Sequence, residues 1–257
     1  MKKTAPSIRA KEFHNVVANT YDDLKKFKKE GNKTAFNALV LGIMTQVNQY
    51  ITVRMNIALA KGLIPERKYN PIGVKNQLFI DIYNHFDQVE IKEELYPWLF
   101  KKADELLAAI LMEEELDEAL FKNIDNYSQA EWDSLELKFG FDADGDLVTM
   151  EEIDDISYRK DDYILNQVFV EDGKKETMVK LDKKMGREAI RKHTDVVLRH
   201  LPSPMSAVFE LATEYQFDMN EIARIRNQSL DEVQQLFEDT RKTLEASFLN
   251  RYLKDNS

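Results

Sequence analysis

The chain has 257 residues and no cysteine, which excludes disulfide frameworks, cysteine-based zinc sites and thiol catalysis. Its hydrophobic content of 43% can fill one or two cores, and the sequence shows neither an apolar run of about 18 residues nor an N-terminal apolar signal segment. We therefore expect a folded cytoplasmic protein with no membrane insertion.

The net charge of −10 is unevenly distributed along the chain. Residues 111–172 contain 20 acidic and 4 basic side chains, a local charge of −16, so the remainder sums to +6. Residues 1–110 alone carry 17 basic and 12 acidic groups. This distribution predicts two functional terminal segments joined by an acidic spacer. Because the basic residues lie in the terminal segments, nucleic acid remains a candidate partner despite the negative net charge.

Helical spacing dominates the front of the chain. Apolar residues recur every three or four positions, and with only 8 glycines and 6 prolines this predicts a mainly α fold. One helix is expected from Ala35 to Ile57, a second from Val74 to Phe86 and a third from Tyr96 to Ile110, with Gly62 and Pro65 ending the first. Three such helices can close a small bundle.

The helical period is lost in the middle of the chain and resumes near Leu181. Within this stretch, residues 135–149 and 164–174 each place Asp-Gly after alternating apolar residues, a pattern that favours short β-hairpins. The middle is therefore expected to be an acidic linker or insert that carries some strand.

The first of these segments has two interpretations, a calcium-binding loop and a plain turn. If Gly145 is the loop glycine, then Asp142, Asp144 and Glu151 fall on ligand positions, but Gly140 occupies the first one. The plain turn is favoured because that first carboxylate is missing.

Three helices are expected near the C-terminus. The first covers residues 203–213, and the second begins after Asp218, which can form a capping box with Glu221. Ser229 and Glu232 repeat the Ser-x-x-Glu pattern before the last helix. A helix, a tight turn and a second capped helix are the plan of a helix-turn-helix, whose second helix enters the major groove of DNA.

The stretch from Leu201 to Leu244 resembles, without a gap, region four of bacterial extracytoplasmic-function (ECF) sigma factors. The matching marks are Leu201-Pro202, Val208-Phe209, Leu211, Glu221-Ile222-Ala223, Ser229, Val233 and Arg241 with Leu244, and Thr240 stands where the family has a small residue.

Three earlier stretches are similar to region two of the same family. They are Gly31 to Leu39, Asn70 to Tyr83 and Pro97 to Ala103. Together with the C-terminal segment they cover about half of the chain. In the family, region two grips RNA polymerase and reads the minus-ten promoter element.

The resemblance implies a domain plan and partners. We expect a helical region-two-like domain over residues 1–115, an acidic linker over 116–180 and a region-four-like helix-turn-helix domain over 181–257. The expected partners are core RNA polymerase and promoter DNA, with an anti-sigma factor as a further candidate. The function implied is that of a sigma factor in transcription initiation.

The resemblance also implies site residues. Those expected at the minus-thirty-five element are Ser229, Gln234, Gln235, Arg241 and Lys242. Those expected at the minus-ten element are His85, Trp98, Lys101 and Lys102, and those expected at the polymerase are Asn76, Gln77, Asp81 and Tyr83.

Several of these residues have a plain structural alternative. Trp98, Tyr96, Phe86, His85 and Tyr83 could form an aromatic platform for an unstacked base, but aromatic residues at these positions are more often bundle core. His85 fits a loop as readily as a DNA contact.

A basic run extends from Lys174 to Arg199, with 9 basic and 4 acidic residues. It could follow a DNA backbone. It could equally be a solvated helix face, or a partner for the acidic spacer.

The acidic side chains of the last helix support a different function. Asp231, Glu232, Glu238 and Asp239 would face phosphates unfavourably, which favours a sigma-like interaction protein that binds polymerase or a regulator without reading promoters. Catalysis has no candidate constellation, the histidines show no metal spacing, and we expect neither an enzyme nor a cofactor or metal.

Overall fold

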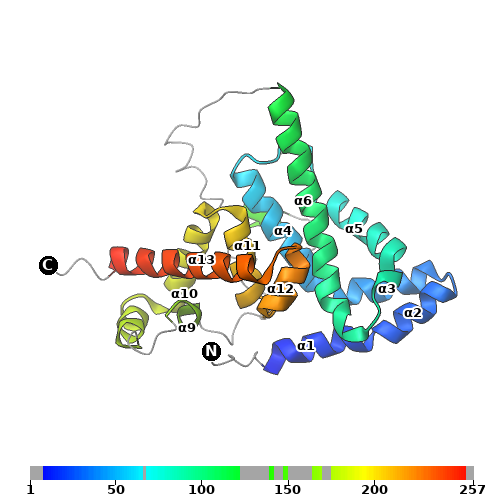
Figure 1. Cartoon of the computed structure of the whole chain (residues 1–257), viewed down its shortest axis with the longest axis horizontal. Helices are drawn as coiled ribbons and strands as arrows, with labels where there is room; N and C mark the ends of the chain where they lie inside the picture. Colours follow the sequence, from blue (N-terminus) through cyan, green and yellow to red (C-terminus); the bar gives the residue numbers. More distant parts are fainter. Residues whose placement is uncertain are drawn as a thin grey trace. The chain divides into compact units, whose positions relative to one another are not determined.

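The computed structural model describes residues 8–65, 68–121, 139–141, 147–149, 164–169 and 175–252. The fold is mainly helical, as the sequence predicts (Figure 1). The chain divides into two compact units: residues 11–157, here the N-terminal unit, and residues 158–257 with 1–10, here the C-terminal unit. No helix in the described parts of the chain combines the length and apolar character that crossing a bilayer requires.

The N-terminal unit is built on six α-helices and two 3₁₀ turns among its described residues. Two of these helices, at the very front, were not expected from the sequence. The elements are α1 Ile8–Asn19, α2 Tyr21–Lys29, α3 Lys33–Ile43, α4 Thr45–Ala60, α5 Pro71–His85, η1 Phe86–Gln88, η2 Lys92–Glu94 and α6 Leu95–Phe121.

The single helix expected from Ala35 to Ile57 is wrong, because the chain forms α3 and α4 with a break at Met44. The last turn of α3 closes there through a hydrogen bond from the Met44 amide to the Leu41 carbonyl of 3.4 Å. Gly42 lowers helix propensity just before the break, and Met44 itself is fully buried. The break lets each helix bury its own apolar stripe.

The second helix begins earlier than expected. Pro71 occupies the first turn of α5, and the Asn70 side chain caps it by accepting a hydrogen bond of 2.9 Å from the Ile72 amide. Proline at a helix start loses nothing, because the amide it lacks has no intrahelical partner there. The breaks at Gly62 and Pro65 are confirmed, since α4 ends at Ala60.

The middle of the chain contains short strands and a short helix. β1 Phe139–Phe141 pairs antiparallel with β2 Leu147–Thr149, with Phe139 opposite Thr149. The residues that would join them, and with them the calcium-loop carboxylates, lie outside the described residues. The hairpin expected from residue 164 is wrong at its start, because α9 Ile164–Val168 is helical.

The helix α9 forms because its apolar residues suit helical spacing as well as alternation. Leu165, Val168 and Phe169 lie three and four positions apart, and all three are buried in one hydrophobic cluster. A strand would have turned neighbouring residues to opposite faces and buried fewer of them.

The C-terminal unit is organised around its last helix. Its helices are α9, α10 Lys175–His200, α11 Ser203–Thr213, α12 Met219–Arg226 and α13 Leu230–Tyr252. Helices α9, α10, α11 and α12 all contact α13 (Figure 1). Leu244 and Phe248 of α13 are fully buried in the cluster that also contains Leu165, Val168, Phe169, Leu181, Ile190 and Phe209.

Helix α10 is not continuous. The backbone leaves helical geometry at Gly186, where φ is +73°. Only glycine adopts this conformation without strain, so the glycine sets the direction change in the basic run.

Candidate nucleic-acid and partner interfaces

Helix α12 is capped at both ends. Asp218 accepts hydrogen bonds of 2.8 and 2.9 Å from the amides of Asn220 and Glu221, and Glu221 accepts one of 2.8 Å from the Asp218 amide. Asn227 ends α12 in the left-handed conformation, with φ of 51°. The predicted capping box is confirmed.

The second capping box forms at the start of α13. The Ser229 amide and hydroxyl donate to a Glu232 carboxylate oxygen at 2.9 and 2.8 Å, and the Glu232 amide donates to the Ser229 hydroxyl at 3.3 Å. These bonds stabilise the charged carboxylate and hold the pKa of Glu232 below its usual range. Ser229 therefore acts as a cap, with its hydroxyl already engaged.

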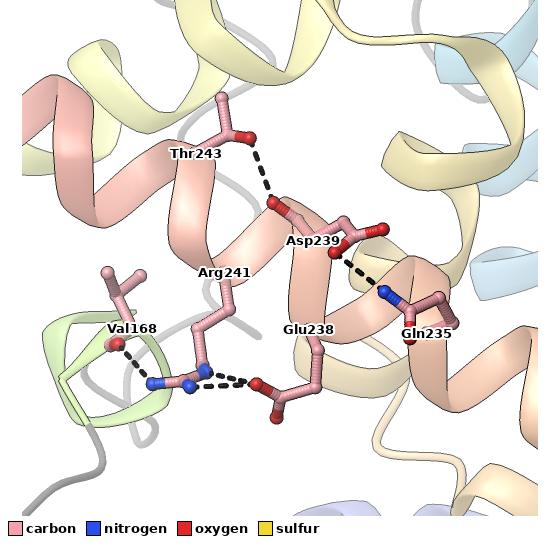
Figure 2. Close-up of polar contacts among 6 residues, drawn as sticks. All are labelled: Val168, Gln235, Glu238, Asp239, Arg241 and Thr243. Carbon is pink, nitrogen blue, oxygen red and sulfur yellow. Dashed lines mark hydrogen bonds and ion pairs between the residues drawn. The ribbon is translucent and has the colours of Figure 1, made fainter.

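The two glutamines expected to read bases lie in different environments. Gln235 is exposed, and its side-chain amide donates to Asp239 at 2.9 Å, whereas Gln234 is half-buried (Figure 2). Lys242 is exposed further along α13. The solvent-exposed face at the start of α13 therefore carries side-chain amides together with carboxylates.

Arg241 does not lie open to a DNA backbone as expected. It is only 8% exposed, and its guanidinium donates to Glu238 at 3.0 and 2.7 Å and to the Val168 carbonyl at 3.4 Å (Figure 2). The planar guanidinium therefore links α9 to α13, and its N–H groups find their hydrogen-bond acceptors inside the protein. The reason is spacing, because Arg241 falls on the buried side of α13 between Val233 and Leu244.

The exposed start of α13 is acidic. Asp231 and Glu232 are exposed in its first turn, where their negative charges interact favourably with the positive end of the helix dipole. Because Arg241 is buried, Lys242 is the exposed cation among the residues expected at the minus-thirty-five element. If this face binds a DNA duplex, the carboxylates of Asp231 and Glu232 must point away from the phosphates.

Trp98, Tyr96 and Phe86 are core, the alternative that the sequence favoured over an aromatic platform for a base. Trp98 is 9% exposed, Tyr96 and Phe86 are each 2% exposed, and Trp98 meets Phe86 edge to face with centroids 6.4 Å apart. The Trp98 indole donates to Gln88 at 3.4 Å. Burial of these large rings stabilises the bundle, so they cannot stack on a base without unpacking it.

Of the polar residues expected beside them, His85 is exposed, whereas Lys101 and Lys102 are half-buried. His85 is exposed at the end of α5, with its ring Nδ1 3.1 Å from the Asp81 carbonyl. Lys102 forms an ion pair of 2.9 Å with Glu105 and lies 5.9 Å above the Trp98 ring, while Lys101 lies 4.0 Å from Glu105. Glu105 partly neutralises this pair of lysines.

The outer face of α5 carries the residues expected at the polymerase. Asn76 and Gln77 are exposed, whereas Asp81 and Tyr83 are half-buried. Ile72 and Ile80 flank the two amides and are 43% and 55% exposed. Sequence reasoning missed these isoleucines, although their spacing of eight residues around polar positions is a signal for a second apolar stripe. We call Ile72, Asn76, Gln77 and Ile80 the α5 face.

The basic run of α10 is largely solvated. Lys183, Lys184 and Arg187 are exposed, and Lys192 pairs with Glu188 at 3.3 Å within the same helix. Arg191 is half-buried. Within the described part of the chain, no group of three or more histidine, aspartate or glutamate side chains could hold a metal ion.

No family model, curated protein or solved structure matches the chain. The resemblance to ECF sigma factors rests on the sequence motifs given above.

The Arg241 contact predicts an order of destabilisation. Glu238→Ala should lower the free energy of unfolding by about 3 kcal/mol, because it leaves a buried cation without its carboxylate. Arg241→Met should cost only about 1–2 kcal/mol, since it keeps the aliphatic packing and leaves a solvated Glu238. Urea unfolding of the full chain measures both, with Gln235→Ala as a control that stays within about 0.5 kcal/mol of wild type. The reverse order would show that Arg241 is not held by this pair.

Proposed function

We propose that this chain is a sigma-type transcription factor that binds core RNA polymerase and positions its C-terminal helix-turn-helix on promoter DNA. The observation that carries the proposal is the pair α12–α13. Asn227 in the left-handed conformation and the Ser229–Glu232 capping box fix its turn, the Asp218–Glu221 box starts α12, and the pair carries residues that resemble the motif of region four.

The internal packing of the pair supports this proposal. Ile222 and Ile225 of α12 and Val233 of α13 are buried, and these apolar residues hold the two helices together. The start of α13 remains exposed, which is the end a helix-turn-helix presents to base edges. Gln234 and Gln235 supply amides suited to adenine, and Lys242 supplies a cation for the backbone.

The α5 face supports the polymerase partner. Exposed isoleucines around two amides form an apolar strip with a polar centre, a surface that another helix can cover. The position of the strip coincides with the segment that resembles the family's polymerase-binding helix. The acidic middle of the chain would then connect the two units.

Polymerase binding is tested by changing one residue of the α5 face. Ile80→Asp should weaken capture by purified core RNA polymerase by about tenfold or more, because a carboxylate replaces apolar area at the interface. Ile80 is exposed, so the fold should be unaffected. Ile91→Asp is the matched control, since Ile91 is 52% exposed and lies outside the α5 face.

Equal capture of both variants, or no capture of the wild-type chain, would contradict polymerase binding through α5. Run-off transcription on a promoter library completes the test. A sigma-type factor must yield a promoter-dependent transcript with core polymerase.

A second candidate function is favoured by the acidic start of α13. In that case the chain is a sigma-like regulator that binds polymerase or another partner without reading promoters. The burial of Arg241 and the exposure of Asp231 and Glu232 are the observations behind it.

Mobility-shift titrations with promoter DNA separate the two functions. For a promoter reader, Lys242→Ala should lower affinity and make the salt dependence shallower by about one unit of slope. Lys92→Ala removes one exposed lysine elsewhere and should change neither quantity. If the wild-type chain captures polymerase but the complex shows no promoter preference, the regulator is favoured instead.

A further inference from the structure

A cluster of lysines in the N-terminal unit lies outside the α5 face and outside the α12–α13 pair. Lys25, Lys26, Lys28 and Lys29 come from α2, and Lys33 begins α3. All but Lys28 are exposed. We call these five residues the α2 patch.

The α2 patch has no carboxylate partner within the described residues. Lys28 donates to the Tyr83 carbonyl, and Lys25 donates to the Tyr21 hydroxyl at 3.4 Å. In contrast, Lys68, Lys92, Lys101, Lys102 and Lys192 each lie within 4.0 Å of a glutamate. Among the described residues, the patch is therefore a local group of lysines without a carboxylate within 4.0 Å, in a chain of net charge −10.

Helix geometry places three of the lysines on one open face of α2. At about 100° per residue, Lys25, Lys26 and Lys29 fall within an arc of about 100°. Lys25 and Lys29 are four positions apart, where like charges destabilise a helix. A bound anion would remove that repulsion.

The helix dipole does not account for the whole cluster. Cations at the end of α2 are favoured by its dipole, but Lys33 occupies the first turn of α3, where a cation is unfavourable. The end of α2 and the start of α3 therefore combine into one positive surface. Lys28 and Lys33 converge on the Tyr83 ring, at 4.0 and 5.2 Å from its centroid, and hold that surface together.

We propose that the α2 patch binds the phosphodiester backbone of nucleic acid without reading its sequence. Protein interfaces are depleted in lysine and built around apolar or aromatic anchors, whereas backbone contacts to nucleic acid come from lysine and arginine. Lysine ammonium groups suit phosphates as point charges. The proposal goes beyond the sigma-type function and does not depend on it.

The test is fluorescence anisotropy of the full chain with a labelled duplex of random sequence and no polymerase. The triple variant Lys25→Gln, Lys26→Gln and Lys29→Gln should bind at least about tenfold more weakly at 50 mM salt. The slope of log affinity against log salt should become shallower by about 2.7, since each lost phosphate contact removes about 0.9. Glutamine keeps the helix propensity of lysine, so α2 should remain folded.

Two controls accompany the triple variant. Lys92→Gln removes an exposed lysine outside the patch and should leave the slope unchanged, unlike Lys29→Gln alone. Asp22 falls within the same arc of α2 as the three lysines, so Asp22→Asn should strengthen binding, because it removes a nearby negative charge.

Unchanged affinity in the triple variant, or no binding by the wild-type chain, would overturn the proposal. So would a triple variant that loses binding to polyglutamate but not to the duplex, because the partner would then be an acidic protein. A chain that keeps the lysine-dependent slope yet fails in run-off transcription contradicts only the sigma-type function.

Discussion

The burial of one side of α13 is the constraint on which the C-terminal unit depends. Leu244 and Phe248 lie in the cluster that joins α9, α10 and α11, and Val233 packs nearer the start, where α12 crosses. The buried side of α13 is therefore needed for packing. Only the opposite, solvent-exposed side of the helix is available to a partner, and this determines which side chains the partner can contact.

This constraint explains why Arg241 and Lys242 have different roles although they are neighbours. A helix turns about 100° per residue, so one faces the interior and the other faces solvent. Arg241 is held by Glu238 and the Val168 carbonyl, and it secures α9 against α13. A segment beyond the expected helix-turn-helix domain thus takes part in its core.

The sequence predicted local features better than the position of side chains. The caps at Asp218 and Ser229 follow from short-range chemistry, and both form. The break at Met44 and the helix α9 were missed because apolar spacing there fits more than one arrangement, and tertiary burial decides between them. Core was the favoured interpretation for Trp98, but the burial of Arg241 could not be read from a family motif, since a motif records residue types and not which side of a helix faces the core.

Hydrogen exchange along α13, in the full chain alone and then with core polymerase and promoter duplex, tests the account most directly. The amides of residues 244–250 should exchange slowly in both states, whereas those of residues 230–232, at the exposed helix start, should exchange faster in the chain alone and slow down in the complex. Uniform protection along α13 in the free chain, with no change on adding polymerase and duplex, would contradict the account. The start of the helix would then be part of the core rather than the surface offered to a partner.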